Sequence, residues 1–424
     1  MTTRAMALPL RTYAAFWAVI PGIFLVFAYY MSQPSFATAT GYWTGVVGRS
    51  TGYMIFSCSL CAMLAAVDGS RLRRTAGRDV ATARPWWQIT WSAVWPTFAL
   101  AALLQGFGLY LSSWGSWGAP GRFPWGIVAA WLAMIALHIS FGLMLGLLLP
   151  VVVAAPVALI ASYSWLGFLW ALDYTPARYL SGLTMMNCCT PESRFPVEAA
   201  LATITFSVLA LIGILIVVRS RLRHTQRRGM TLTFAVILPV LGGVAAVGLA
   251  APLGTMPNPP RGAQDLHCEQ AMIDICVYPE QIWRAASDPI HDIDAGIHNL
   301  SAQGIAVPAI VTTDSTNRTP GALTLTLQRD FTTPMTLHSL AFSIANPHPE
   351  RVCDNHDPEL SARSSNLATA LVYAWMTGGQ EDPGVPPTDS AAVASILTSP
   401  DAADWFVETR EALYTCSIPL PGNP

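Results

Sequence analysis

Lysine is absent from this chain of 424 residues, because all 23 of its basic side chains other than histidine are arginine. A P-loop needs a lysine on the β and γ phosphates, a protein kinase needs its strand lysine, and pyridoxal phosphate and retinal need a lysine Schiff base. A genome that favours arginine codons explains the absence, and the exclusion holds either way. The chain therefore cannot hydrolyse ATP by a Walker mechanism, and any ATP-driven role must belong to a partner.

Two hydrolase signatures are also missing. The sequence contains neither HExxH, which marks a zinc protease, nor GxSxG, which marks a serine nucleophile. The run from His291 to Asp294 lacks the pair of histidines four residues apart that a helical zinc site needs. The carboxyl-terminal histidines are His267, His291, His298, His338, His348 and His356. We expect no catalytic residue, no metal site and no cofactor, and we expect that the chain is not an enzyme.

Charge is scarce, at 11% of residues, whereas 53% are hydrophobic. The apolar residues gather in seven stretches near 14–30, 51–67, 91–111, 125–145, 151–172, 199–218 and 231–251. Stretches of about 20 residues match a hydrocarbon core of about 30 Å. Pro150 divides the fourth stretch from the fifth. The sequence predicts a polytopic bundle of about seven transmembrane helices, and the first is too long for a cleaved signal peptide, the alternative interpretation.

The arginines predict the orientation of these helices, because basic residues in short loops stay on the cytoplasmic side. They cluster before the first stretch, after the second and after the sixth: Arg4, Arg11, Arg71, Arg73, Arg74, Arg78, Arg84, Arg219, Arg221, Arg223, Arg227 and Arg228. Asp68 and Asp79 are the only carboxylates in the same segments, so these segments are strongly basic. We therefore predict a multi-pass protein of the cell membrane with a cytoplasmic amino terminus and an extracytoplasmic carboxyl-terminal domain.

Residues 1–251 form the predicted membrane domain, 252–266 a linker rich in proline and glycine, and 267–424 an α+β domain. From residue 255 onward the chain has seven arginines and twenty carboxylates, so this region is acidic. An acidic surface argues against nucleic acid as a partner. Periodicity predicts a helix over 280–300, strands over 322–328 and 335–345, and helices over 364–375, 390–397 and 402–414. Ser390 and Asp401 are the predicted N-caps of the last two helices.

Four of the eight cysteines, Cys268, Cys276, Cys353 and Cys416, lie in the predicted extracytoplasmic domain, where disulfides persist. The short separation favours a bridge from Cys268 to Cys276, which leaves Cys353 for Cys416. A metal site that uses these thiols and His267 is the alternative, although the spacing matches no known zinc pattern. Cys58 and Cys61 are expected to pack within the second span, and the adjacent Cys188 and Cys189 are free thiols or bridge to a partner.

Polar residues at membrane depth are few, and Gln105 and His138 are the two that stand out. A polar side chain inside a span is costly unless it faces other helices or water. We expect both side chains to face the bundle interior. For His138, a hydrogen bond between helices is favoured over a transport role.

The layout of residues 1 to about 228 resembles that of the membrane subunits of type 2 ABC transporters. In those proteins an inner segment after the second span engages a separate ATPase, and a short outer re-entrant segment precedes the sixth span; here residues 71–84 and 173–197 occupy these places. In the tail, the run from Cys268 to Glu280 is similar to the cysteine-containing opening of actinobacterial permease-like proteins. The seventh span and the large tail depart from ordinary permeases.

The resemblance implies a permease or permease-like subunit of an ABC-type exporter, working with a separate cytoplasmic ATPase. Arg71, Arg73, Arg74 and Arg78 would then form the ATPase-contact loop; the alternative is that they only set topology and touch anionic lipid. The expected partners are this ATPase, the lipid bilayer and a second subunit in a homodimer or heterodimer. A non-transporting, membrane-anchored binding or sensory protein is the contrasting hypothesis, and a tethered external hydrolase ranks last.

Overall fold

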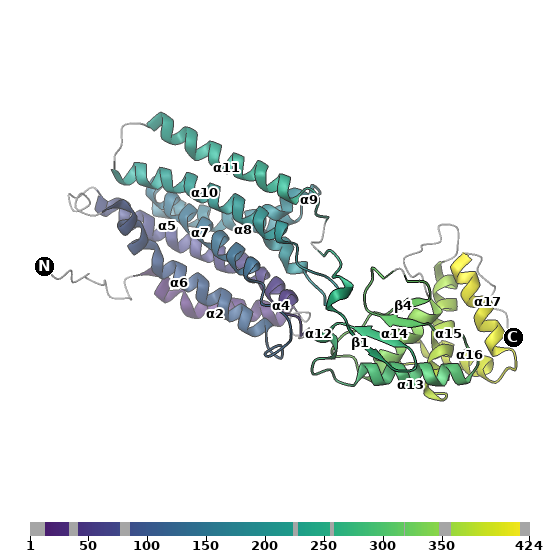
Figure 1. The fold of residues 1–424 in the computed structure, drawn as a ribbon. Coiled ribbons are helices and arrows are strands. Elements are labelled where there is room, and N and C mark those ends of the chain that lie inside the picture. Colours follow the sequence, from purple (N-terminus) through teal and green to yellow (C-terminus); the bar gives the residue numbers. More distant parts are fainter. Residues whose placement is uncertain are drawn as a thin grey trace. The chain divides into compact units, whose positions relative to one another are not determined.

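The computed structural model describes residues 13–33, 41–76, 85–223, 228–254, 258–317, 319–346 and 358–415. The chain divides into two compact units, Met1–Pro259 and Pro260–Pro424, which are described separately here. The first is a bundle of long apolar helices, and the second combines helices with a small sheet (Figure 1). The predicted fold class, a helical membrane bundle followed by an α+β region, is confirmed.

Within the described residues, six helices are long and apolar enough to cross a membrane. They are α4–η2–α5 (Trp43–Arg49, Ser50–Tyr53 and Met54–Ala76), α6 (Trp86–Ser112), α7 (Trp125–Leu148), α8 (Val151–Trp170), α10 (Val197–Arg223) and α11 (Arg228–Ala250). The predicted first span holds α1 (Ala14–Trp17) and α2 (Val19–Ser32), which meet at Ala18. At 14 residues, α2 is shorter than a full crossing requires.

Helices α5 and α7 approach each other through residues that lack large side chains. A Cβ added to Gly142 of α7 would overlap the carbonyl oxygen of Ala62 in α5, and one added to Gly146 would overlap that of Ala66. Small residues four apart allow such backbone contact, which is how helices associate where no hydrophobic effect drives them together. Helix α5 also packs against α6 and α8, and α10 lies along α11 (Figure 1).

Large apolar side chains cover the outside of the bundle. Ile20 of α2 and Val152 of α8 are each 81% exposed, and exposed apolar residues also lie on α6, α10 and α11. In water such a surface would mark an interaction or aggregation site. Together with the length of the helices, it identifies a multi-pass membrane protein whose outer face contacts lipid.

A segment of short helices between α8 and α10 folds into the bundle. It comprises α9 (Thr175–Arg178), η4 (Tyr179–Ser181) and η5 (Leu183–Asn187), with Gly182 in the left-handed region between the last two (φ 73°). Residues 179–185 are buried. Thr203 of α10 donates a hydrogen bond to the carbonyl oxygen of Tyr179, at 2.8 Å. Irregular backbone at this position is tolerated because protein covers it and satisfies its polar groups.

The second unit contains a four-stranded sheet in the order β1 (His267–Gln270), β2 (Asp274–Val277), β3 (Ile310–Thr312), β4 (Ala322–Thr324). Strands β1 and β2 form an antiparallel hairpin in which Cys268 faces Cys276, and β2, β3 and β4 are parallel. The helices of this unit are η6 (Ala263–Asp265), α12 (Pro279–Ile282), α13 (Pro289–Ala302), α14 (Thr333–Ala345), α15 (Pro358–Thr377), α16 (Pro387–Leu397) and α17 (Ala402–Thr415).

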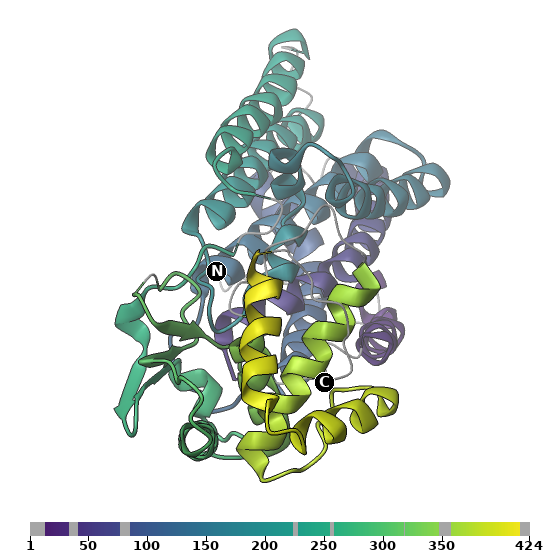
Figure 2. The same cartoon turned by 90° about the vertical axis from the view of Figure 1, so that its right-hand side faces the viewer.

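One apolar core holds the second unit together. Ile293, Ile297 and Leu300 form the buried stripe of α13, and they belong to the same cluster as Val311 of β3 and Leu371 of α15. Helix α15 contacts α13, α14, α16 and α17, and Figure 2 shows α17 alongside it. Burial of apolar surface from water supplies the main driving force for such a core.

The strand predicted over 335–345 is wrong, because these residues lie in helix α14. Its buried residues include Leu337, Leu340, Ala341 and Ile344, a spacing of three and four that the apparent alternation concealed. Pro334 occupies the first turn of the helix, where its missing N–H costs nothing.

The helix predicted over 280–300 is two helices instead of one. Helix α12 ends at Ile282, and Arg284 adopts a left-handed backbone conformation (φ 49°). The carboxylate of Asp288 then accepts hydrogen bonds from the backbone N–H groups of Ile290 and His291 and starts α13. In the last predicted helices, Ser390 lies inside α16 rather than at its start, whereas Asp401 directly precedes α17.

Candidate functional site

The arginines of the predicted ATPase-contact loop begin in the last turns of α5. Arg73 and Arg74 are exposed. Arg71 binds its own helix, because its Nη1 lies 3.1 Å from Oδ1 of Asp68, a residue only 5% exposed. Arg78 lies outside the described residues. Arg71 keeps an exposed side chain despite this ion pair, and Arg73 and Arg74 are exposed without an ion pair in the described part of the chain, so a partner can reach all three at this end of α5.

Gln105 of α6 connects helices. Its Nε2 donates a hydrogen bond to the carbonyl oxygen of Ser50 at 2.7 Å, and the hydroxyl of Ser57 donates to its Oε1 at 3.4 Å. Ser50 opens the 3-10 turn between α4 and α5. Both ends of the amide are thus engaged with the second span, as expected for a polar residue that joins helices in a membrane.

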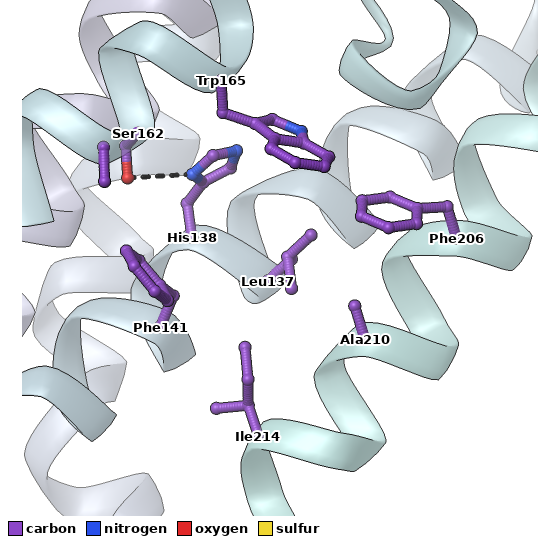
Figure 3. A pocket seen from close by; sticks show the side chains of 9 residues that line it. Leu137, His138, Phe141, Ser162, Trp165, Phe206, Ala210 and Ile214 are labelled. Carbon is purple, nitrogen blue, oxygen red and sulfur yellow. Dashed lines mark hydrogen bonds between the residues drawn. The ribbon is translucent and has the colours of Figure 1, made fainter. Parts of the chain in front are cut away.

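His138 of α7 has one engaged nitrogen and one unengaged nitrogen. Its Nδ1 lies 3.0 Å from Oγ of Ser162 in α8, which gives a hydrogen bond between the two helices (Figure 3). Its Nε2 is buried without a hydrogen-bond partner among the described residues, and the whole residue is 4% exposed. A buried polar atom without a partner is unusual in a folded protein and requires an explanation.

His138 also lines a cavity of about 210 Å³ between α7, α8 and α10. The cavity is lined mainly by apolar and aromatic side chains: Leu137, His138, Phe141, Ala161, Ser162, Trp165, Phe206, Ala210 and Ile214. Trp165 of α8 stacks on Phe206 of α10, with ring centroids 5.1 Å apart and planes 12° apart, and the stack bridges these two helices beside the cavity (Figure 3).

Trp165 supplies a second polar atom that lacks a partner. Its Nε1 is buried and has no hydrogen-bond acceptor in the described part of the chain. An indole N–H is a donor only. His138 and Trp165 thus line one apolar cavity, and each has a buried nitrogen without a partner in the described part of the chain, which makes this the candidate functional site of the bundle.

The sequence pointed to His138 but missed Ser162, Trp165 and Phe206. A signal existed for two of them, since Ser162 and Trp165 are three residues apart and so share one face of a helix. Neither their approach to α7 nor the stacking of Phe206 on Trp165 could be inferred, because both depend on which helices become neighbours.

In the second unit, Cys268 and Cys276 form a disulfide across the β1–β2 hairpin, with an S–S distance of 2.04 Å. Cys353 and Cys416 lie outside the described residues, so their predicted pairing stays a prediction. Cys58 and Cys61 are buried free thiols in α5. The structure pairs Cys188 with its neighbour Cys189, and both are buried just after η5, in the segment between α8 and α10.

An acid–base pair occurs in the second unit, where Nδ1 of His338 lies 2.7 Å from the buried carboxylate of Asp382. The backbone N–H of Gly384 donates to the same carboxylate, at 2.9 Å. Burial, and then the charge of Asp382, raise the pKa of Tyr373. The pair fastens the loop before α16 onto α14. Among the described residues, no group of three or more His, Cys, Asp or Glu side chains is placed to hold a metal ion.

Comparisons with models of protein families, with curated proteins and with solved structures found no match. The chain is thus established as a helical multi-pass membrane protein with a mixed α/β region, and no family is identified.

Proposed function

We propose that this chain is a permease or permease-like membrane subunit of an ABC-type exporter, driven by a separate cytoplasmic ATPase. In this proposal the amino terminus and the arginine-rich end of α5 lie in the cytoplasm, and the second unit lies outside the cell. The chain itself is proposed not to be an enzyme; without lysine it has no P-loop, so the partner hydrolyses the ATP.

The observation that carries the proposal is the construction of α5. Its last turn presents Arg73 and Arg74 to a partner, and its middle packs backbone to backbone on Gly142 and Gly146 of α7. Close-packed interiors transmit displacements with little loss. A partner that moves the end of α5 would therefore move α7, which carries His138. The buried segment between α8 and α10 supports the same proposal, because it occupies the place of the re-entrant segment in the resembling subunits.

The proposal is tested by affinity isolation of the full chain from native membranes in mild detergent, with identification of any ATPase that accompanies it. The Arg73→Gln/Arg74→Gln variant should lose most of the co-isolated ATPase. Arg122→Gln changes an exposed arginine between α6 and α7 and is the matched control, which should retain the ATPase. Absence of any ATPase from the wild-type eluate would overturn the proposal, and equal capture by both variants would overturn the assigned contact.

The second unit favours one alternative, a membrane-anchored binding or sensory protein. It has its own apolar core and a polar pocket of about 590 Å³, whose lining includes Glu269, Arg284 and Asp288. Pockets of this size hold small molecules. If no ATPase accompanies the chain, a stable ligand complex of residues 260–424 made alone would favour this alternative over transport.

A further inference from the structure

A recess of about 390 Å³ lies along one side of α6, near the end of the helix at Ser112. Its lining includes Gly106, Leu109, Tyr110 and the C-cap residue Ser113. These residues are three or four apart, so they share one face of the helix. Gly106 is exposed, and Tyr110 is 47% exposed. The recess therefore opens on the surface that the bundle presents to lipid.

Three aromatic side chains from outside α6 complete the lining and form an aromatic wall: Trp43, Trp117 and Phe123. Trp43 begins α4, and the other two belong to the segment between α6 and α7. The ring centroid of Trp43 lies 5.6 Å from that of Trp117, with planes at 77°, and 5.6 Å from that of Phe123, with planes at 59°. Aromatic rings attract each other in edge-on arrangements of this kind, so the wall is held in place by its own contacts.

The recess crosses the boundary between the hydrocarbon core and the lipid head groups. Helix α6 has 27 residues and is about 40 Å long, whereas the hydrocarbon core is about 30 Å thick. Each end of a centred helix then extends about 5 Å beyond the core. Gly106 lies about 9 Å before the end of the helix, within the hydrocarbon. The recess thus has one part at acyl-chain depth and one part, beside the aromatic wall, at the depth of the glycerol esters.

Packing does not require the glycine at position 106. A Cβ added to Gly106 meets no described atom within 4 Å, whereas a Cβ added to Gly108 overlaps the ring of Tyr53. Glycine inside a helix is less favourable than alanine, so a glycine there usually has a packing or functional reason. Contact with another helix supplies that reason at Gly108. At Gly106 the missing side chain instead keeps the recess open at acyl-chain depth.

We propose that this recess binds one glycerophospholipid. One acyl chain lies over Gly106 and Leu109, and the glycerol esters lie against the aromatic wall. Lipid is the occupant because the recess continues the exposed apolar surface of α6, on which Leu103 is 49% exposed. Among the described residues that line the recess, none is charged. The site therefore recognises the acyl chain and the esters rather than the charge of the head group.

This binding is independent of the proposed function, because it requires neither an ATPase nor a particular orientation of the chain. The alternative role of the aromatic wall is that of a general interfacial anchor. An anchor contacts whichever lipids are nearby and does not saturate, whereas a binding site does. Saturation therefore distinguishes the two roles.

The test uses the purified full chain in an alkyl maltoside, with phosphatidylcholine that carries a diazirine in one acyl chain. After photolysis at increasing lipid concentration, labelled peptides are identified by mass spectrometry. We expect labels near Gly106 and on the aromatic wall to saturate, and labels on the other lipid-facing helices to increase in proportion to the lipid. Labelling that increases in the same way on every helix would overturn the proposal.

The first variant fills the recess. Gly106→Leu should lower the saturable labelling roughly tenfold or more, because the new side chain occupies the place assigned to the acyl chain. Gly167→Leu in α8 is the matched control, since a Cβ added there also meets no described atom within 4 Å and Gly167 does not line the recess. The control should leave the labelling unchanged. Equal effects of the two leucine variants would contradict the site.

The second variant removes part of the aromatic wall. Trp117→Ala should lower the saturable labelling roughly threefold to tenfold. Trp87→Ala, at the other end of α6, is the control, because both tryptophans are 56% exposed and Trp87 does not line the recess. Phosphatidylglycerol with the same acyl chains should compete as well as phosphatidylcholine. Each variant is compared at equal recovery of monodisperse protein. Equal effects of the two tryptophan variants, or competition by only one of the two lipids, would overturn the proposal.

Discussion

The two units of this chain place apolar side chains in opposite ways. In the bundle, close contacts are made by Gly142 and Gly146, and large apolar residues such as Ile20 point outward. In the second unit, Ile293 and Leu371 are fully buried, and apolar exposure is confined to a few side chains. Apolar side chains are therefore exposed where the surrounding solvent is lipid and buried where it is water. In lipid, burying a leucine side chain gains no hydrophobic free energy, so helices associate through close packing and hydrogen bonds. In water, the hydrophobic effect drives the second unit to form an apolar core.

The largest effect is expected from a cavity in the water-facing core. Phe406 of α17 is fully buried and packs edge-on against Trp375, with ring centroids 5.7 Å apart. Phe406→Ala should destabilise the second unit by about 3–5 kcal/mol. Its neighbour Val407 is 59% exposed, and Val407→Ala should change stability by no more than about 0.5 kcal/mol. Protease resistance of the second unit in denaturant measures both, and a small effect of Phe406→Ala would contradict the assigned core.

The same substitution at two equally exposed valines compares the two solvents directly. Val240 in the middle of α11 is 57% exposed, and Val407 is 59% exposed. Val240→Asp should cost about 2.5–3.5 kcal/mol of membrane insertion, because lipid cannot solvate a carboxylate. Val407→Asp should be tolerated within about 0.5 kcal/mol. Insertion is read from a glycosylation acceptor placed after α11, and unfolding from proteolysis; equal tolerance at both sites would mean that α11 does not face lipid.

The disulfide belongs to the water-facing unit, so its removal should affect that unit alone. Cys268→Ser/Cys276→Ser opens a loop closed over a sequence separation of 8. In the chain-entropy model such a short loop contributes about 2–3 kcal/mol. We expect the second unit to become easier to digest while the bundle keeps its thermal stability in detergent. A matching loss in the bundle would show that the two units do not unfold independently.

The smallest of these effects concerns the contact between α5 and α7. Gly142→Ala places a methyl group against the carbonyl of Ala62 and should destabilise the bundle by about 1–3 kcal/mol through forced separation of the helices. Gly243→Ala in α11 is the control, since nothing lies within 4 Å of an added Cβ there. The midpoint of heat-induced aggregation in detergent compares them. Equal midpoints would mean that backbone contact does not hold these helices together.

The spans could be predicted because the bilayer requires runs of apolar residues of a certain length, and such runs are visible in the sequence itself. The error over residues 335–345 has a different cause. Leu340 and Phe342 of α14 are two residues apart, as in a strand, and only packing against α13 and α15 shows that the buried residues have a spacing of three and four. The Cys268–Cys276 bridge was predicted from separation alone, and the hairpin that aligns these cysteines explains it. Strands β1, β2 and β3 are too short to show a clear alternation of apolar and polar residues in the sequence.

The sequence by itself determined that the chain enters a membrane several times, that it cannot supply its own P-loop, and that an acidic α+β region follows the spans. These properties depend on composition, run length and the absence of one amino acid. Only the tertiary structure decided that Gln105 connects helices and that His138 and Trp165 line one cavity. Helices in lipid recognise one another by shape and by paired polar atoms, and neither is visible until the helices are neighbours.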